Sequence, residues 1–218
     1  MPSTRYQKIN AHHYRHIWVV GDIHGEYQLL QSRLHQLSFF PEIDLLISVG
    51  DNIDRGPESL DVLRLLNQPW FTSVKGNHEA MALEAFETGD GNMWLASGGD
   101  WFFDLNDSEQ QEAIDLLLKF HHLPHIIEIT NDNIKYAIAH ADYPGSEYLF
   151  GKEIAESELL WPVDRVQKSL NGELHQINGA DYFIFGHMMF DNIQTFANQI
   201  YIDTGSPNSG RLSFYKIK

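Results

Sequence analysis

The sequence predicts an α/β fold in which two packed β-sheets of mixed strand direction are flanked by helices. Apolar runs rich in β-branched residues recur along the 218 residues, as strands do. In the first third these runs alternate with helical patterns, which is typical of a parallel sheet. Further along, two runs are separated only by the turn-like stretch TNDN at 130–133, which predicts an antiparallel hairpin. Two packed sheets with helices outside would accommodate both halves.

The elements follow from these patterns in chain order. The predicted strands lie at residues 16–20, 44–49, 71–74, 125–130, 134–139, 182–185, 193–203 and 211–217. The predicted helices lie at residues 27–37, 59–67, 78–86, 108–121 and 159–170. Ser108 and Gln111 have the spacing of a capping box at the start of the fourth helix.

The chain is expected to form a single domain over residues 1–218. No internal repeat, low-complexity tract or linker rich in proline or serine divides the sequence. Chains usually split into several domains only beyond ~250–300 residues. One hydrophobic core therefore suffices for this length.

Composition excludes several classes of protein. No apolar run approaches the ~18 residues that a membrane-spanning helix needs. Residues 1–16 lack the apolar core of a secretory signal, and the absence of cysteine excludes a disulfide framework. We therefore expect a cytoplasmic protein that has no membrane partner.

The charge balance argues against a nucleic-acid partner. With 15 basic and 30 acidic residues the formal net charge is -15, which repels a phosphate backbone. A small anionic substrate would need a local positive site.

Polar residues follow five of the predicted strands. The motifs are GDIHG (21–25), GDNIDRGP (50–57), GNHE (76–79), AHAD (139–142) and FGHM (185–188). In open α/β sheets ligands bind beyond the carboxyl ends of strands, so these motifs can converge on one crevice. Asp22 and His24, two apart in a segment expected to be extended, would point to the same side, and Gly21 and Gly25 permit a tight turn.

Each polar residue also has an ordinary structural interpretation. Asp22, Asp51 and Asn77 could simply cap the helices that follow them. A single histidine such as His140 or His187 is usually a packed core or edge residue. The combination is more specific, because carboxylate, imidazole and amide groups recur at Asp22, His24, Asp51, Asn77, His140 and His187. This mixture of ligands favours Mn, Fe or Zn over Ca.

The ordered motifs GDIHG, GDNIDRGP, GNHE, a later histidine and a final GH resemble the signature of the calcineurin-like metallophosphoesterases. Within that family the chain is similar to the bacterial and phage-type serine/threonine (phosphoprotein) phosphatases. The resemblance extends from Gly21 to the closing IDTGSPNSGRLSFYKI, which is similar to the last hairpin of the family. It implies the metallophosphoesterase sandwich, with a dimetal site at the carboxyl ends of the strands.

The resemblance implies two divalent cations as cofactors, Mn²⁺ first, with Fe or Zn as alternatives. It assigns Asp22, His24 and Asp51 to the first cation and Asp51, Asn77, His140 and His187 to the second, with Asp51 as the bridge. A water shared by two cations would lose its proton near neutral pH, and the resulting hydroxide would attack phosphorus directly. The cations would also make the crevice positive in an acidic protein.

The resemblance also implies the catalytic side chains. Arg55 matches the arginine that binds the substrate phosphate, and we expect Asn77 to contact that phosphate too. His78 matches the general acid that protonates the leaving alkoxide, and Asp54 the carboxylate that orients it. Arg165 is a looser match to a second phosphate-binding arginine, with a solvated helical charge as the alternative.

Three further features bear on the site. The segment WLASGGDWFFD (94–104) is interpreted mainly as aromatic packing, with lining of the substrate groove as a weaker alternative. Asn52 and Met188 depart from the family pattern beside predicted ligands. Metal preference and substrate shape are therefore open.

The expected function is metal-dependent hydrolysis of phosphoserine and phosphothreonine in proteins or peptides, with phosphotyrosine as a further substrate. A dinucleoside polyphosphate hydrolase is the first alternative, but such relatives tend to replace the acid of DRGP, which is present here as Asp54. A catalytically silent scaffold of the same fold is the second alternative. It is disfavoured because every ligand position is filled.

Overall fold

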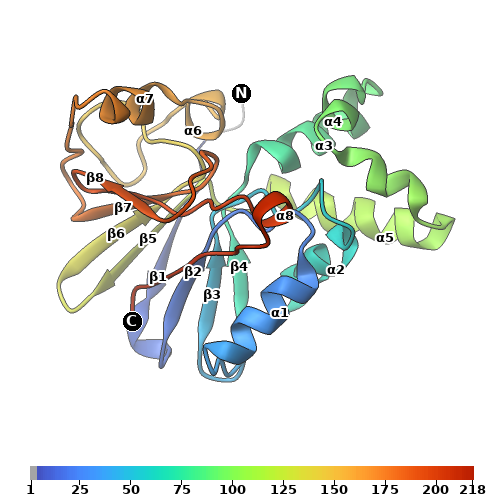
Figure 1. Ribbon diagram of the computed structural model, residues 1–218, viewed down its shortest axis with the longest axis horizontal. Helices are drawn as coiled ribbons and strands as arrows, with labels where there is room; N and C mark the ends of the chain where they lie inside the picture. The colour runs from blue at the N-terminus through green and yellow to red at the C-terminus, as the bar shows by residue number, and fades with distance from the viewer. Residues whose placement is uncertain (1–3) are drawn as a thin grey trace.

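The computed structural model describes residues 4–218, which form two β-sheets packed face to face with helices outside (Figure 1). Buried side chains from both sheets meet between them, among them Val19 on one side and Ile127 and Ile184 on the other. Because side chains alternate along a strand, Val20 faces the opposite way and packs against helices. The predicted fold class is confirmed.

The smaller sheet has the strand order β10-β2-β3-β4. Its strands are β2 (Ile17–Val20), β3 (Leu45–Ser48), β4 (Phe71–Ser73) and β10 (Phe214–Lys216). β2, β3 and β4 are parallel, and β10 pairs antiparallel to β2. The connections contain α1 (Tyr27–Gln36) and α2 (Ser59–Arg64), which continues as a 3-10 turn, η2 (Leu65–Asn67). The predicted parallel β-α-β-α-β unit is therefore confirmed.

The larger sheet has the strand order β1-β5-β6-β7-β9-β8. Its strands are β1 (Tyr6–Asn10), β5 (Ile126–Asn131), β6 (Ile134–Ile138), β7 (Tyr182–Phe185), β8 (Gln194–Phe196) and β9 (Gln199–Tyr201). β5 and β6 form the predicted antiparallel hairpin, while β7 pairs parallel to both β6 and β9. Asp132 and Asn133 adopt the left-handed conformation that a tight hairpin turn requires.

Two strand predictions are corrected, and one strand was not predicted. The run at 193–203 is not one strand but the β8–β9 hairpin, because the chain reverses at Ala197, whose φ is 51°. The closing segment is not a hairpin, since β9 and β10 belong to different sheets. β1 was missed because its polar, half-exposed sequence YQKIN lacks a strong apolar pattern.

Two helix predictions are also corrected. The helix predicted at 159–170 is broken into α6 (Ser157–Leu160) and α7 (Asp164–Leu170), because Pro162 between them cannot continue a helix. α5 (Asp107–Leu117), followed by the 3-10 turn η4 (Leu118–His121), is capped by Asn106 with Glu109 rather than by Ser108 with Gln111. The side-chain spacing was right for a capping box but displaced by two residues.

An arm of helices rises beside the smaller sheet (Figure 1). It contains α3 (Asn77–Thr88), α4 (Asn92–Ala96), the 3-10 helix η3 (Gly99–Asp104) and α5, and α8 (Ser206–Ser209) lies near its base. Trp94, Trp101 and Phe102 pack with Leu116 in a separate core that holds the arm together. α4 and η3 were not predicted as helices, because they are short and are bounded by glycines at 91, 98 and 99.

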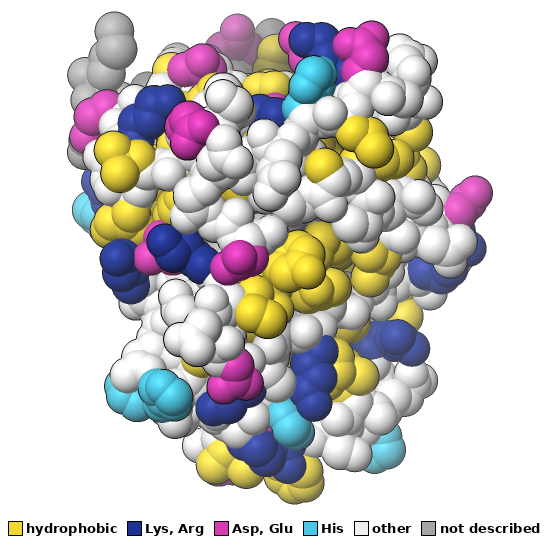
Figure 2. Space-filling model, turned by 90° about the vertical axis from the view of Figure 1, so that its left-hand side faces the viewer, with side chains coloured by type: hydrophobic (Ala, Val, Ile, Leu, Met, Phe, Trp, Pro, Cys, Tyr) yellow, Lys and Arg dark blue, Asp and Glu magenta, His cyan; other side chains and the backbone are white. Residues whose placement is uncertain are grey.

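Over the described residues, no helix has the length and apolar character needed to span a membrane. On the face shown in Figure 2, acidic, basic and histidine side chains are scattered among small hydrophobic areas. The net charge of -15 is therefore not gathered on this face.

Candidate dimetal active site

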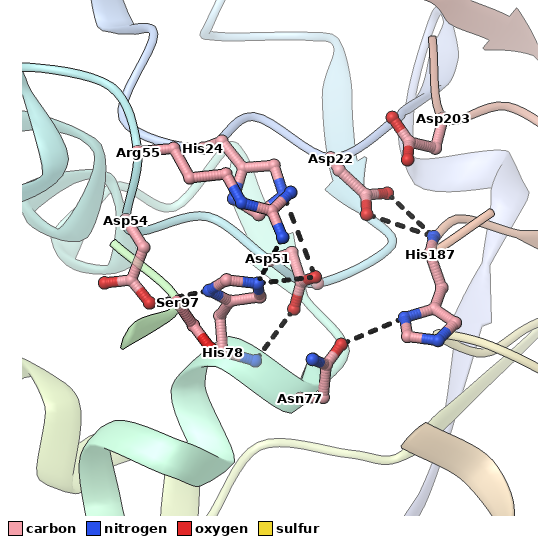
Figure 3. Close-up of polar contacts among 12 residues, drawn as sticks. Asp22, His24, Asp51, Asp54, Arg55, Asn77, His78, Ser97, His187 and Asp203 are labelled. Carbon is pink, nitrogen blue, oxygen red and sulfur yellow. Dashed lines mark hydrogen bonds and ion pairs between the residues drawn. The ribbon is translucent and has the colours of Figure 1, made fainter. Parts of the chain in front are cut away.

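The six predicted metal ligands meet where the two sheets end. Asp22 and His24 follow β2, Asp51 follows β3, and Asn77 begins α3 after β4. The two remaining ligands, His140 and His187, follow β6 and β7. All are buried except His187, which is partly exposed. Figure 3 shows five of these side chains turned toward one another from separate loops.

The backbone at this site is unusual. His24, Asp51 and His187 have φ values of 47°, 50° and 63°, a left-handed conformation that costs energy outside glycine. The expectation of an extended segment through His24 is therefore wrong, although the turn at Gly25 is present, with φ 68°. Strained residues that recur at one place indicate a site whose geometry is imposed by function.

One group of ligands surrounds Asn77. Its Oδ1 lies 2.7 Å from Nε2 of His140 and 3.0 Å from Nδ1 of His187. Oδ1 of Asp51 lies 3.4 Å from the same Nε2 of His140. The opposite ring nitrogen of His140 is 2.8 Å from the Val49 carbonyl, which fixes the ring orientation. These atoms can hold one cation.

A second group shares Asp51 with the first. Ligand atoms of His24, Asp51 and His78 lie within 4.8 Å of one another, as do those of Asp51, His140 and His187. Nδ1 of His24 is 2.9 Å from the Ile53 carbonyl, which leaves Nε2 facing Asp51. Asp51 thus belongs to both groups. A carboxylate shared by two cations would need this position.

The electrostatics of the site fit cations. Burial, followed by the neighbouring Asp203 and Asp51 carboxylates, raises the pKa of Asp22 well above its usual value. Bound cations would compensate this excess of buried negative charge. Burial lowers the pKa of His24 to about 3, so that this ring is neutral and can donate a lone pair to a metal.

The predicted catalytic side chains also lie together. Nδ1 of His78 is 2.6 Å from Oδ2 of Asp54. Burial opposes protonation of His78, but the Asp51 and Asp54 carboxylates outweigh it and raise the pKa of the imidazole. The two terminal nitrogens of Arg55 lie 2.8 Å from Nε2 of His24 and 3.0 Å from Nε2 of His78. The Arg55 guanidinium and the His78 imidazole therefore face the ligand cluster.

Comparison with known proteins identifies the family of this arrangement. The sequence profile described as calcineurin-like phosphoesterase matches residues 15–190, which include the six predicted ligands as well as Asp54, Arg55 and His78. The chain belongs to the calcineurin-like phosphoesterase family.

Individual members of the family resemble the chain over its whole length. Serine/threonine-protein phosphatase 2 of Escherichia coli (strain K12) is 99% identical over 218 residues, and the protein of that name from Salmonella typhimurium is 61% identical, each covering 100% of both chains. A symmetrical bis(5'-nucleosyl)-tetraphosphatase of Erwinia tasmaniensis is 33% identical over 126 residues, which are 57% of this chain and 43% of that protein.

Solved structures support the same fold at low sequence identity. A putative diadenosine tetraphosphatase superposes with a TM-score of 0.71 and 22% identity, covering 98% of this chain and 94% of the other. A serine/threonine phosphatase from Saccharomyces cerevisiae superposes with a TM-score of 0.63 and 19% identity, covering 93% and 71%. At such identities the likeness concerns the calcineurin-like fold alone.

Glu79 is a site residue that the sequence interpretation did not assign. Its fully buried carboxylate accepts four N–H groups: the backbone N–H of Asp51, Asn52 and Gly76 at 3.0, 2.6 and 2.9 Å, and the Asn52 side-chain amide at 3.2 Å. Glu79 therefore joins the loops that carry Asp51 and Asn77. The signal was available in the GNHE motif, but the motif alone does not show which backbone groups the acid meets.

Asp203 is a second acid that was missed. It is buried, and its carboxylate accepts the N–H of Gly205 at 2.8 Å. Figure 3 shows it beside Asp22, whose pKa it helps to raise. The surrounding IDTGSP was interpreted only as strand and turn, so nothing in the pattern placed this side chain at the metal ligands.

Arg165 is the predicted phosphate-binding residue with the least support. Its Nε donates to Oδ1 of Asp142 at 2.8 Å, and one terminal nitrogen donates to the carbonyls of Tyr143 and Gly145 at 2.8 and 2.7 Å. These contacts anchor the side chain to the loop after His140. The anchoring argues against the alternative of a purely solvated charge. It does not by itself assign Arg165 a role in phosphate binding.

The two departures from the family pattern differ in environment. Asn52 is buried, and its amide donates to Ser73 Oγ at 3.0 Å and to Glu79. Met188 packs beside the core that contains Phe185 and Tyr201. Asn52 thus supports the acid behind Asp51, whereas Met188 belongs to packing.

Proposed function

We propose that the chain is a metal-dependent protein phosphatase that hydrolyses phosphoserine and phosphothreonine. The observation that carries this proposal is the buried His78–Asp54 pair, 2.6 Å apart, at the edge of the ligand cluster. A serine alkoxide is a poor leaving group, so its ester needs an acid to protonate it. Two relatives of the same length, 99% and 61% identical, are named serine/threonine-protein phosphatases, which supports the assignment.

The residues of the chain divide the reaction between them. Arg55 offers a planar fork of N–H groups to phosphate oxygens and balances charge that develops on them. His78 gives its Nε2 proton to the serine oxygen as the phosphorus–oxygen bond breaks, while Asp54 holds Nδ1. The products are the free hydroxyl side chain and inorganic phosphate, with the new oxygen supplied by water. We assign no step to Arg165 beyond an expected contact with phosphate.

The cofactor of the proposed reaction is a pair of divalent cations, for which we propose Mn²⁺. By resemblance to the family, Asp22, His24 and Asp51 would hold one, and Asp51 with Asn77, His140 and His187 the other. The structure supports this division through the clustering of Asp51 with His24 and of Asp51 with His140 and His187, and through the contacts of Asn77 with both of these histidines. When bound, such cations supply positive charge for the phosphate and activate water as a nucleophile. Mixed oxygen and imidazole ligands without thiolate suit Mn, and they also suit Fe or Zn.

The test is hydrolysis of defined phosphate esters by the purified protein. With Mn²⁺ added, phosphoserine and phosphothreonine peptides should release inorganic phosphate, and chelation should abolish the release. Phosphotyrosine peptides define the breadth of the activity. Failure to hydrolyse any phosphopeptide with Mn²⁺, Fe²⁺ or Zn²⁺ present would refute the proposal.

A dinucleoside polyphosphate hydrolase is the second candidate, because a symmetrical bis(5'-nucleosyl)-tetraphosphatase matches 57% of the chain. An anhydride has a good leaving group and does not need the His78–Asp54 acid. Cleavage of diadenosine tetraphosphate at a higher kcat/KM than any phosphopeptide would favour this alternative. For the leading phosphatase proposal, we also propose a cytoplasmic location, where phosphorylated proteins would be its substrates.

A further inference from the structure

The carboxylate of Asp54 is held by three ring N–H groups. Besides His78, Nε1 of Trp94 lies 2.9 Å from Oδ1 and 3.1 Å from Oδ2, and Nε1 of Trp101 lies 2.7 Å from Oδ1. Asp54 has no exposed surface, and both tryptophans are buried. The interpretation of residues 94–104 as mainly aromatic packing was therefore incomplete.

The two indoles come from one segment of the helical arm. Trp94 lies on α4 and Trp101 on η3, and their rings meet edge to face with centroids 6.3 Å apart. A Cβ at Gly99 would lie 2.6 Å from the Trp94 indole, so only glycine lets the chain turn between them. The carbonyl of Gly98 accepts the backbone N–H of Arg55 at 3.1 Å. This segment therefore contacts both Asp54 and the residue that follows it.

We propose that Trp94 and Trp101 are positioning residues for the general acid. Their indole N–H groups fix the rotation of the Asp54 carboxylate and keep Oδ2 2.6 Å from Nδ1 of His78, which holds the imidazole toward the leaving oxygen. This inference rests on the proposed phosphatase function. It goes beyond that function because it gives the helical arm a role in orienting the general acid.

Packing alone does not account for these contacts. An indole N–H is a donor only, and leaving it unpaired in a dry interior costs free energy. Phe86 and Phe102 fill the same aromatic cluster without any polar atom, which shows that phenylalanine suits this core. Two of the five tryptophans nevertheless direct their only donor at one buried carboxylate.

The experiment uses Trp94→Phe and Trp101→Phe in the Mn²⁺-loaded protein, with Trp70→Phe as the control. Trp70 packs against Phe39 and Phe71 beside the core between the smaller sheet and helices α1 and α2. Each variant is assayed on phenyl phosphate and p-nitrophenyl phosphate, which are similar in size. The nitro group stabilises the departing phenolate, so hydrolysis of the second ester depends much less on an acid.

If the indoles position the acid, kcat on phenyl phosphate should fall about 10-fold or more in both variants, because this ester needs protonation of its leaving group. On p-nitrophenyl phosphate, which does not need it, kcat should fall by less than about 3-fold. The Trp70→Phe variant should match the wild type on both esters. An equal loss on the two esters would show a structural role and overturn the inference, as would unchanged hydrolysis of phenyl phosphate. Wild-type protein inactive on both would instead refute the proposed function.

A second measurement does not depend on the tryptophan variants folding well. In the proton NMR spectrum of the wild-type protein, the indole N–H signals of Trp94 and Trp101 should lie downfield of that of Trp70, because a carboxylate accepts both. Asp54→Asn should move these two signals and leave the Trp70 signal in place. If Asp54→Asn moves neither signal, the proposed contact does not exist.

Discussion

At the scale of single residues, Asp51 organises the site through its backbone as much as through its carboxylate. Its carbonyl accepts the N–H groups of Ile23 and His24 at 3.1 and 2.9 Å. Its Oδ1 accepts the N–H of His78 at 3.0 Å, and its own N–H donates to Glu79. One strained residue therefore ties together the loops after β2, β3 and β4, which carry most of the proposed ligands.

The buried carboxylate of Glu79 makes a stability prediction. In Glu79→Gln one oxygen becomes an NH₂ group that faces N–H donors, so buried donors lose their acceptor. Unfolding by urea in the presence of chelator should show a loss of about 2–4 kcal/mol, since unsatisfied buried donors and lost charged hydrogen bonds each cost this order. Glu84→Gln, exposed on the same helix, is the matched control and should change stability by less than about 0.5 kcal/mol. A comparable loss in both variants would contradict the assignment.

The general acid makes a kinetic prediction. His78→Asn should lower kcat on a phosphoserine peptide by about 10²- to 10⁴-fold, because a positioned acid contributes this much. Metal content, measured by atomic absorption after gel filtration, should stay the same as in the wild type. Since the His78 ring also lies near His24 and Asp51, loss of metal would show that it is a ligand instead.

At the scale of elements, the junctions between strands and helices decide the geometry. At the β4–α3 junction a Cβ on Gly76 would lie 2.2 Å from Oδ1 of Asp51. Close approach of two backbones at this point lets α3 present Asn77 and His78 together. At the start of α6, Glu156 lies 3.0 Å from Lys75, which follows β4, and 2.8 Å from His125, which precedes β5. This network joins α6 to both sheets.

The Glu156 network makes a prediction about pH. The hydrogen bond from His125 lowers the pKa of Glu156, and Lys75 adds to it against the opposing effect of burial, so that the pKa falls to about 2. Because the folded pKa is below the ordinary value of 4.5, the contribution to stability is complete above that value and is lost as the pH falls toward 2. Urea unfolding should show Glu156→Gln less stable than the wild type by about 1–2 kcal/mol at pH 7, after allowance for screening by solvent.

The same comparison near pH 3 should show a smaller difference, since Glu156 is then largely protonated in the unfolded chain. Glu158→Gln, exposed on α6, should leave stability unchanged at both pH values. A deficit for Glu156→Gln that did not shrink on acidification would mean that the charge of Glu156 is not what stabilises the junction.

At the scale of the whole molecule, negative charge dominates both the composition and the interior of the site. The net charge is -15, and Asp22, Asp51, Glu79 and Asp203 are buried within one region. Burying several carboxylates without cations is costly, so the protein should be most stable with metal bound.

A calorimetric comparison tests this expectation. A metal present at about 1,000 times its Kd adds about 4 kcal/mol, and each kcal/mol raises Tm by about 2–4 °C at this chain length, so excess Mn²⁺ should raise Tm by about 8–16 °C over chelated protein. Asp51→Asn, which removes the proposed bridge, should show a much smaller rise. A rise below about 2 °C in the wild type would argue against a metal site at these residues.

The sequence by itself determined the local chemistry. The β-α-β-α-β pattern, the 130–133 turn and the motifs after the strands were readable because hydrophobic periodicity and turn residues act over a few positions. The predicted ligands Asp22, His24 and Asp51 could be named because each lies next to or near a glycine just after a buried strand. Several such motifs in one order are more specific than any one of them. The family resemblance supplied their roles.

Only the tertiary structure decided which distant groups meet. The indoles of Trp94 and Trp101 could not be assigned to Asp54, nor Glu79 to the backbone of Asp51, because these contacts join residues 28 or more positions apart. β1 could not be found either, since a polar edge strand is defined by its partner β5 rather than by its own pattern. The residue type determines which hydrogen bonds a side chain can donate or accept, whereas the packing of distant segments determines which partner it meets.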